Sequence, residues 1–275
     1  MTLVFRNKLL LVLLSISVLF LLVTGIYFVY AIITKGLFIP TEVRRLIDLP
    51  NILFFRYNFF AAIGSSFILF IYSMVTMYIC YRNFEKTQAA EIIYFVGFCI
   101  GCALEGFRIW LPVLNVWSNF STVFLFFGKS IFLGRFIAIL NLSTMAILSK
   151  DQNGQQFYDS SLVIIIAAAA LLANTIPIDT VLIPSNCSVS FGFEKSYIVL
   201  SIVCILASFV TVFIHAQNIG SREYSKSAIG FLFLAIGYII LTQTDSVIAF
   251  LLGTVALITG TVKFLWNLHK FHTWK

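Results

Sequence analysis

The chain alternates between long apolar segments and short polar connections. An α-helix needs about 20 mostly apolar residues to cross a bilayer core of about 30 Å, and eight segments approach or exceed that length. They cover residues 9–33, 59–80, 91–114, 122–148, 161–182, 196–215, 227–241 and 246–267. None alternates between apolar and polar residues as a barrel strand does. The pattern therefore predicts an all-α fold, a polytopic transmembrane bundle of about eight helices that forms one domain over residues 1–275.

The last two segments are separated only by the polar run Thr242–Asp245. Together they span about 40 residues, twice the length of one crossing. We therefore predict a tight helical hairpin here, although 227–241 is short for a spanning helix.

The longest connection, residues 34–58, has a pattern of its own. Thr41 and Glu42 resemble the start of a helix, with a threonine N-cap and an acidic side chain in the first turn. The apolar residues that follow share one helical face. We expect a short helix over 41–48 that lies in the membrane interface; the alternative is a simple connector.

The balance of charge supports a membrane protein and excludes nucleic-acid binding. Only 11% of the residues are charged and 60% are hydrophobic, whereas soluble domains are about 25% charged. The net charge of +7 comes from basic residues scattered at segment ends, without a dense run. With the N-terminus in the cytoplasm, nine basic residues lie inside and five outside. The nine are Arg6, Lys8, Arg82, Lys86, Lys150, Arg222, Lys226, Lys270 and Lys275, and the five are Lys35, Arg44, Arg45, Arg56 and Lys195. This bias places both termini in the cytoplasm of a plasma or inner membrane.

The third and fourth segments carry ionisable residues at membrane depth. Glu105 and Arg108 are three residues apart, so they share a helical face. Lys129 and Arg135 lie on the next segment, which a short connection makes an antiparallel neighbour. Because charges at this depth are costly, they point to a functional site that faces the bundle interior.

This group contains three cations and one anion. Asp179 and Asn174 on the fifth segment are expected to face it, and Asp179 would reduce the surplus to one positive charge. A bound anion is the remaining partner: a lipid phosphate, a carboxylate solute or chloride. The alternative is structural, with Arg108 and Lys129 extending to the membrane surface while Glu105 pairs with one of them.

Cys99 and Cys102 form a Cys-x-x-Cys pair inside the third segment. Thiol–disulfide chemistry would require a second cysteine pair in an outer loop, and only Cys187 lies there. The alternative is structural: Gly97 and Gly101 form a Gly-x-x-x-Gly face for close helix packing. The three histidines form no cluster, so the sequence predicts no metal site and no cofactor.

The leading functional hypothesis is a small transporter or permease that binds an anionic solute or lipid head group. Two alternatives remain open. One is a non-transporting sensor, or a subunit that binds a membrane-protein partner or a second copy of itself. The other is a lipid-modifying enzyme that uses Glu105, the only deep carboxylate of the third and fourth segments.

Overall fold

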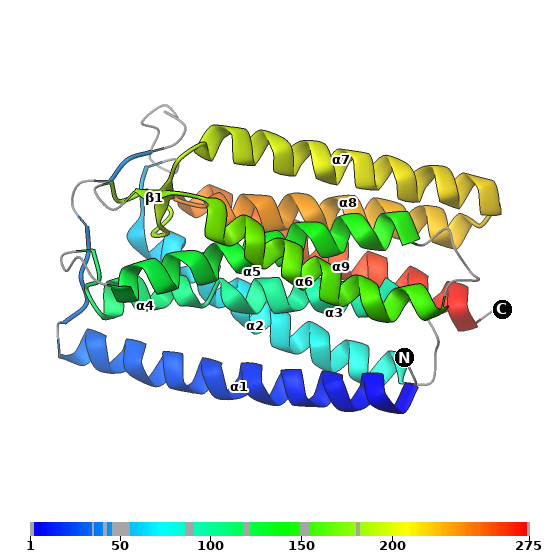
Figure 1. The fold of residues 1–275 in the computed structure, drawn as a ribbon, viewed down its shortest axis with the longest axis horizontal. Helices are drawn as coiled ribbons and strands as arrows, with labels where there is room; N and C mark the ends of the chain where they lie inside the picture. Colours follow the sequence, from blue (N-terminus) through cyan, green and yellow to red (C-terminus); the bar gives the residue numbers. More distant parts are fainter. Residues whose placement is uncertain are drawn as a thin grey trace.

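The computed structural model describes residues 3–34, 36–40, 43–45, 56–85, 91–117, 122–148, 155–179 and 182–273. They form an elongated helical bundle, with α7 along one side and α1 along the other (Figure 1). The helices are α1 (Leu3–Ile33), α2 (Phe59–Phe84), α3 (Glu91–Leu104), α4 (Phe107–Val113), α5 (Thr122–Leu148), α6 (Gln155–Thr175), α7 (Glu194–Ile219), α8 (Arg222–Gln243) and α9 (Val247–Thr273). The first helix begins and the last helix ends at the same end of the bundle (Figure 1), here called the termini end. The opposite end is called the loop end.

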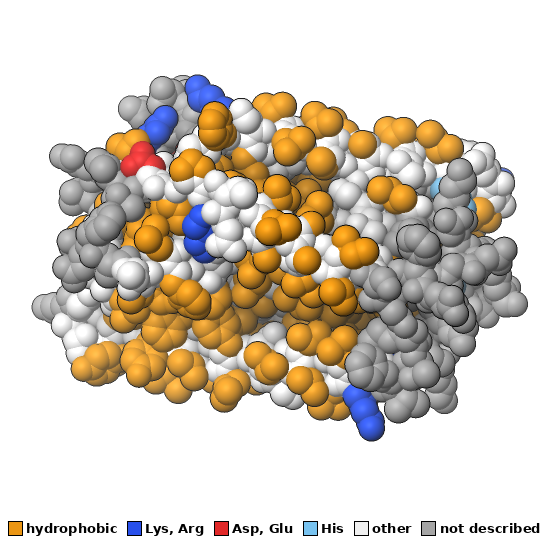
Figure 2. Space-filling model, viewed as in Figure 1, with side chains coloured by type: hydrophobic (Ala, Val, Ile, Leu, Met, Phe, Trp, Pro, Cys, Tyr) orange, Lys and Arg blue, Asp and Glu red, His pale blue; other side chains and the backbone are white. Residues whose placement is uncertain are grey.

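Seven helices in the described part of the chain are long and apolar enough to cross a membrane. They are α1, α2, α3 with α4, α5, α7, α8 and α9, and α6 adds a shorter apolar stretch, Ser161–Thr175. Apolar side chains are spread along the face shown in Figure 2, and few charged side chains lie among them in the part that is not grey. Large apolar side chains on α1 and α7 are more than half exposed, Leu19 and Val199 among them. An all-helical bundle with this surface is typical of a multi-pass membrane protein.

The predicted helix over 91–114 is interrupted. The chain turns at Glu105 and Gly106, and the hydrogen bonds there tighten: the Gly106 N–H donates to the Ala103 carbonyl and the Arg108 N–H to that of Glu105. A Cβ at Gly106 would lie 2.7 Å from the Phe70 ring, so only glycine fits. Such a break inside a helix often marks a functional position.

The predicted helix over 161–182 was wrong at its C-terminal end. Helix α6 stops at Thr175, because Pro177 has no N–H with which to continue the helical bonding. The chain then forms β1 (Ile178–Asp179), which pairs antiparallel with β2 (Ser190–Phe191).

The helix predicted over 41–48 falls mostly outside the described residues. The three that are described, 43–45, are not helical. The Arg44 N–H donates to the Ile183 carbonyl, and the Arg44 carbonyl accepts from the Ser185 N–H. The long connection after α1 is therefore joined here to the loop between α6 and α7.

The predicted hairpin of the last two segments is confirmed. Helices α8 and α9 pack along their length and are joined by Thr244–Ser246. Helix α8 starts at Arg222, earlier than the predicted 227, because the Ser221 side chain caps it by accepting from the Tyr224 N–H.

Candidate functional site

The loop Pro184–Phe191 folds into the bundle at the loop end, and every residue in it is buried. We call it the plug loop. The Asn186 side-chain amide donates to the Thr242 carbonyl and to Gln243 Oε1, both at 3.2 Å, and its oxygen accepts from the Ser188 N–H. These bonds attach the loop to α8. Irregular backbone inside a membrane bundle needs such partners, since lipid offers none.

Beneath the plug loop lies a buried charge cluster of Arg108, Glu105 and Arg135, here called the Arg–Glu–Arg cluster. Arg135 Nε is 2.8 Å from Glu105 Oε1, and Arg108 Nη1 is 3.3 Å from Glu105 Oε2. The three residues are 1% exposed or less. One carboxylate thus serves two guanidinium groups, and the three side chains together carry one uncompensated positive charge.

Arg108 also donates hydrogen bonds to neutral oxygen atoms. Its Nη2 donates to the Ala62 carbonyl at 3.3 Å and to Ser65 Oγ at 3.4 Å, both on α2, and to the Asn186 carbonyl of the plug loop. Its Nε is buried and has no hydrogen-bond partner among the described residues.

Arg135 is held in a similar way from α5. Its Nη2 donates to Ser188 Oγ of the plug loop at 3.2 Å and to the Thr242 carbonyl at 3.4 Å. Its Nη1 is buried and, within the part of the chain that the structure describes, has no hydrogen-bond partner. Each arginine of the cluster therefore keeps one nitrogen unsatisfied, and a buried donor in that state is destabilising.

Cys187 lies at the centre of the plug loop and is fully buried. Burial raises the pKa of its thiol to about 11, although the Arg108 charge acts in the opposite direction. The Tyr57 hydroxyl is 3.9 Å from its sulfur. At neutral pH the thiol is therefore un-ionised, and reagents that attack thiolates reach it only if the loop moves.

Lys129 does not join Glu105. Its Nζ donates to the carbonyls of Asn174 and Ile176, both at 2.8 Å, at the C-terminal end of α6. A cation in this position satisfies terminal carbonyls and compensates the helix dipole. The Asn174 side chain bonds to its own helix at Ala170, and Asp179 lies in β1 rather than on a helix. Lys129 and the Asn174 side chain thus bond near the end of α6 rather than to the Arg–Glu–Arg cluster.

Sequence reasoning missed the groups that surround the two arginines. The carbonyls of Ala62, Asn186 and Thr242 leave no trace in a sequence, because every residue has one. Ser188 and Asn186 belong to a short polar run after Pro184, and such a run is typical of an exposed loop.

The redox hypothesis gains nothing from the geometry. Cys99 and Cys102 are both fully buried, and Cys99 contacts the Thr76 hydroxyl at 3.2 Å. The packing alternative is confirmed: a Cβ at Gly101 would lie 2.5 Å from the Gly134 carbonyl oxygen, so α3 and α5 approach closely here.

No protein-family model, no curated protein and no solved structure matches this chain. By its fold and its site, the chain is an all-helical protein with apolar helices of membrane-spanning length and a buried ion cluster near one end.

Proposed function

We propose that the chain is a small transporter or permease that binds an anionic solute or lipid head group at the Arg–Glu–Arg cluster. The observation that carries this proposal is the surplus positive charge, together with two unsatisfied guanidinium nitrogens, Arg108 Nε and Arg135 Nη1. Carboxylates and phosphates accept hydrogen bonds from guanidinium groups more strongly than neutral oxygens do.

The plug loop would control access to this site. It supplies two neutral acceptors, the Asn186 carbonyl and Ser188 Oγ, and an anion would take their place when the loop moves outward. The helix break at Glu105 and Gly106 provides a second point of adjustment beside the cluster. Interrupted helices with irregular backbone around an ion site are common in transporters.

The same proposal includes eight crossings of a plasma-type membrane, with both termini in the cytoplasm. In Figure 1 α1 begins and α9 ends at the same end of the bundle, which agrees with an even number of crossings. Described basic residues near the termini end are Arg6, Lys8, Arg82, Arg222, Lys226 and Lys270, and those near the loop end are Arg44, Arg45, Arg56 and Lys195. The excess at the termini end favours this orientation.

Thermal unfolding of the detergent-purified protein tests anion binding. Phosphate, acetate, chloride and phosphatidylglycerol are added separately to wild type, Arg135→Gln and Lys129→Gln. A ligand at ten times its Kd is expected to raise the Tm of wild type by about 5 °C. Lys129→Gln loses the same charge outside the cluster and is expected to keep this shift, whereas Arg135→Gln loses it. No shift in wild type, or an equal shift in all three proteins, would contradict the proposal.

A second candidate is a non-transporting sensor or subunit in which the cluster is a structural network. The observation in its favour is that the cluster is closed to solvent. Its three residues are 1% exposed or less, and its hydrogen bonds connect α2, α5, α8 and the plug loop. The third hypothesis, an enzyme with Glu105 as general base, is disfavoured, because each oxygen of that carboxylate already accepts from a guanidinium.

Labelling of Cys187 separates transport from a structural role. The test protein keeps Cys187 and replaces the other four cysteines with alanine. With a pKa of about 11, about 0.1% of the thiols ionise at pH 8, so maleimide labelling is expected to be at least 100-fold slower than in unfolded protein. If the loop moves during binding, the stabilising anion raises this rate at least tenfold. An anion that binds but leaves the rate unchanged favours the structural role.

A further inference from the structure

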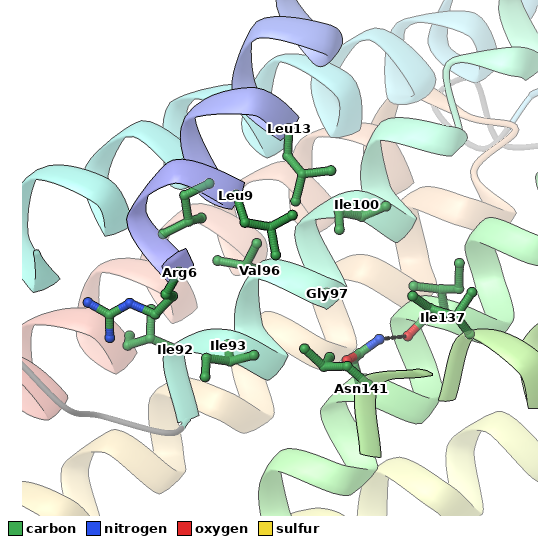
Figure 3. Close-up of a pocket in the computed structure, with 13 residues that line it drawn as sticks. Arg6, Leu9, Leu13, Ile92, Ile93, Val96, Gly97, Ile100, Ile137 and Asn141 are labelled. Atoms are coloured by element: carbon green, nitrogen blue, oxygen red, sulfur yellow. Dashed lines mark hydrogen bonds between the residues drawn. The ribbon is translucent and has the colours of Figure 1, made fainter. Parts of the chain in front are cut away.

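A second feature of the bundle lies between α1, α3, α5 and α6, toward the termini end (Figure 3). It is a cavity of about 330 Å³. Most of its lining is aliphatic, including Leu13, Ile93, Val96 and Ile100. Ligand sites in proteins have volumes of about 300–1,000 Å³ and combine an apolar lining with a few placed polar groups, and this cavity has both properties.

The polar group in its wall is Asn141 of α5, which is 1% exposed. Its amide nitrogen donates to the Ile137 carbonyl at 2.8 Å, while its Oδ1 has no partner in the described ranges of the chain. A Cβ at Gly97 would lie 2.3 Å from this oxygen, so the glycine leaves the space that Asn141 occupies in the cavity wall. Figure 3 shows Asn141 extending from α5 toward Gly97 of α3. A buried acceptor in apolar surroundings is destabilising until it meets a donor.

The cavity opens sideways onto the apolar surface of the bundle. Leu9 and Ile166 line it, and they are themselves 38% and 50% exposed. The opening thus lies on α1 and α6, within the apolar part of both helices. In a membrane this surface meets lipid, so an occupant would arrive from the bilayer.

At the termini end of the cavity lies Arg6, whose guanidinium donates to the carbonyls of Phe84 and Glu85. Figure 3 shows this guanidinium turned away from the cavity. The lining thus presents one hydrogen-bond acceptor, Asn141 Oδ1, in an otherwise aliphatic wall. This arrangement matches a lipid with a hydrogen-bond donor at its linkage region and one hydrocarbon chain.

We propose that this cavity binds the acyl chain of a membrane lipid that carries a hydroxyl or amide N–H near its head group. The donor bonds to Asn141 Oδ1, and the chain fills the aliphatic part. The site is separate from the Arg–Glu–Arg cluster and does not depend on the function proposed for it.

Two lipids with the same hydrocarbon chain, one with hydroxyl donors and one without, test the proposal. The first is 1-palmitoylglycerol, and the second is its diacetylated form, which has the same chain and no hydroxyl group. At ten times its Kd, the first is expected to raise the Tm of the detergent-purified protein by about 5 °C. The diacetylated lipid is expected to give less than half of that shift. Equal shifts from the two lipids would overturn the role of Asn141.

Three variants locate the site. Leu13→Trp fills the cavity and is expected to abolish both shifts, whereas Leu19→Trp, on the same helix at a position 65% exposed, keeps them. Asn141→Leu is expected to give the two lipids equal shifts. Shifts that survive in Leu13→Trp would place the lipid elsewhere.

Native mass spectrometry gives a readout that does not depend on stability. Wild type is expected to retain one 1-palmitoylglycerol molecule and Leu13→Trp none. If the wild-type protein retains no lipid but dimerises in nanodiscs, and Leu13→Trp prevents the dimer, a helix of a second copy occupies the cavity and the proposal is wrong.

Discussion

Replacing Glu105 with glutamine is expected to destabilise the protein by about 3–5 kcal/mol, because it leaves two buried guanidinium groups without a counter-charge. Glu105 is the partner of both Arg108 and Arg135, and all three side chains are buried. At 2–4 °C per kcal/mol, the Tm should fall by about 6–20 °C. Thermal unfolding in detergent measures this change.

A double variant shows whether the loss is electrostatic. Glu105→Gln raises the charge of the cluster from +1 to +2, and adding Arg135→Gln returns it to +1. The double variant should therefore be more stable than Glu105→Gln alone. Glu223→Gln is the control, because Glu223 pairs with Lys226 at the surface and exposed pairs contribute about 0–1 kcal/mol. A Glu105→Gln protein as stable as this control would show that the cluster carries little electrostatic energy.

The parts of the cluster that could be predicted from sequence are those set by helix geometry. Glu105 and Arg108 meet because they are three residues apart, and the short connection to α5 brings Arg135 alongside. Lys129 is six residues from Arg135, about 120° around the same helix. Both cannot face Glu105, and only Arg135 does.

The rest of the site depends on where the chain leaves helical structure. The run of apolar residues predicts that the fifth segment extends to residue 182, but Pro177 ends α6 and the chain continues into β1. Asp179 therefore moves off the helix that was expected to present it. The plug loop follows from the same change, since its buried position depends on a backbone partner in α8, the Thr242 carbonyl, that has no sequence signal.

The helix interiors were predictable, and their ends were set by local caps. Helix α2 begins at Phe59, as the sequence predicts, because the Asn58 side chain accepts from the Ala61 N–H. At its other end the helix extends to Phe84, past the predicted residue 80, since Arg82 is polar but a good helix former. Hydropathy locates the membrane core, whereas hydrogen bonding decides where the helix stops.

The second large effect on stability is expected where α8 and α9 pack closely against each other. A Cβ at Gly260 of α9 would lie 2.3 Å from the backbone nitrogen of Leu234, and one at Gly237 of α8 would lie 2.4 Å from that of Leu257. Backbone atoms cannot turn aside as a flexible side chain can, so α8 and α9 must separate to admit the added carbon. Small residues allow this close approach, which stabilises membrane helices through van der Waals contact.

Gly260→Ala is accordingly expected to destabilise the protein by about 3 kcal/mol, the upper part of the usual range for overpacking. Gly25→Ala is the matched control: the same substitution in another helix, at a position where nothing lies within 4 Å of the added Cβ. Because alanine favours helix over glycine, this control should be unchanged or stabilised by up to about 1 kcal/mol. Thermal unfolding of both variants checks the contrast. Equal behaviour would mean that α8 and α9 separate at little cost, and that the hairpin is held by its side-chain contacts rather than by its glycines.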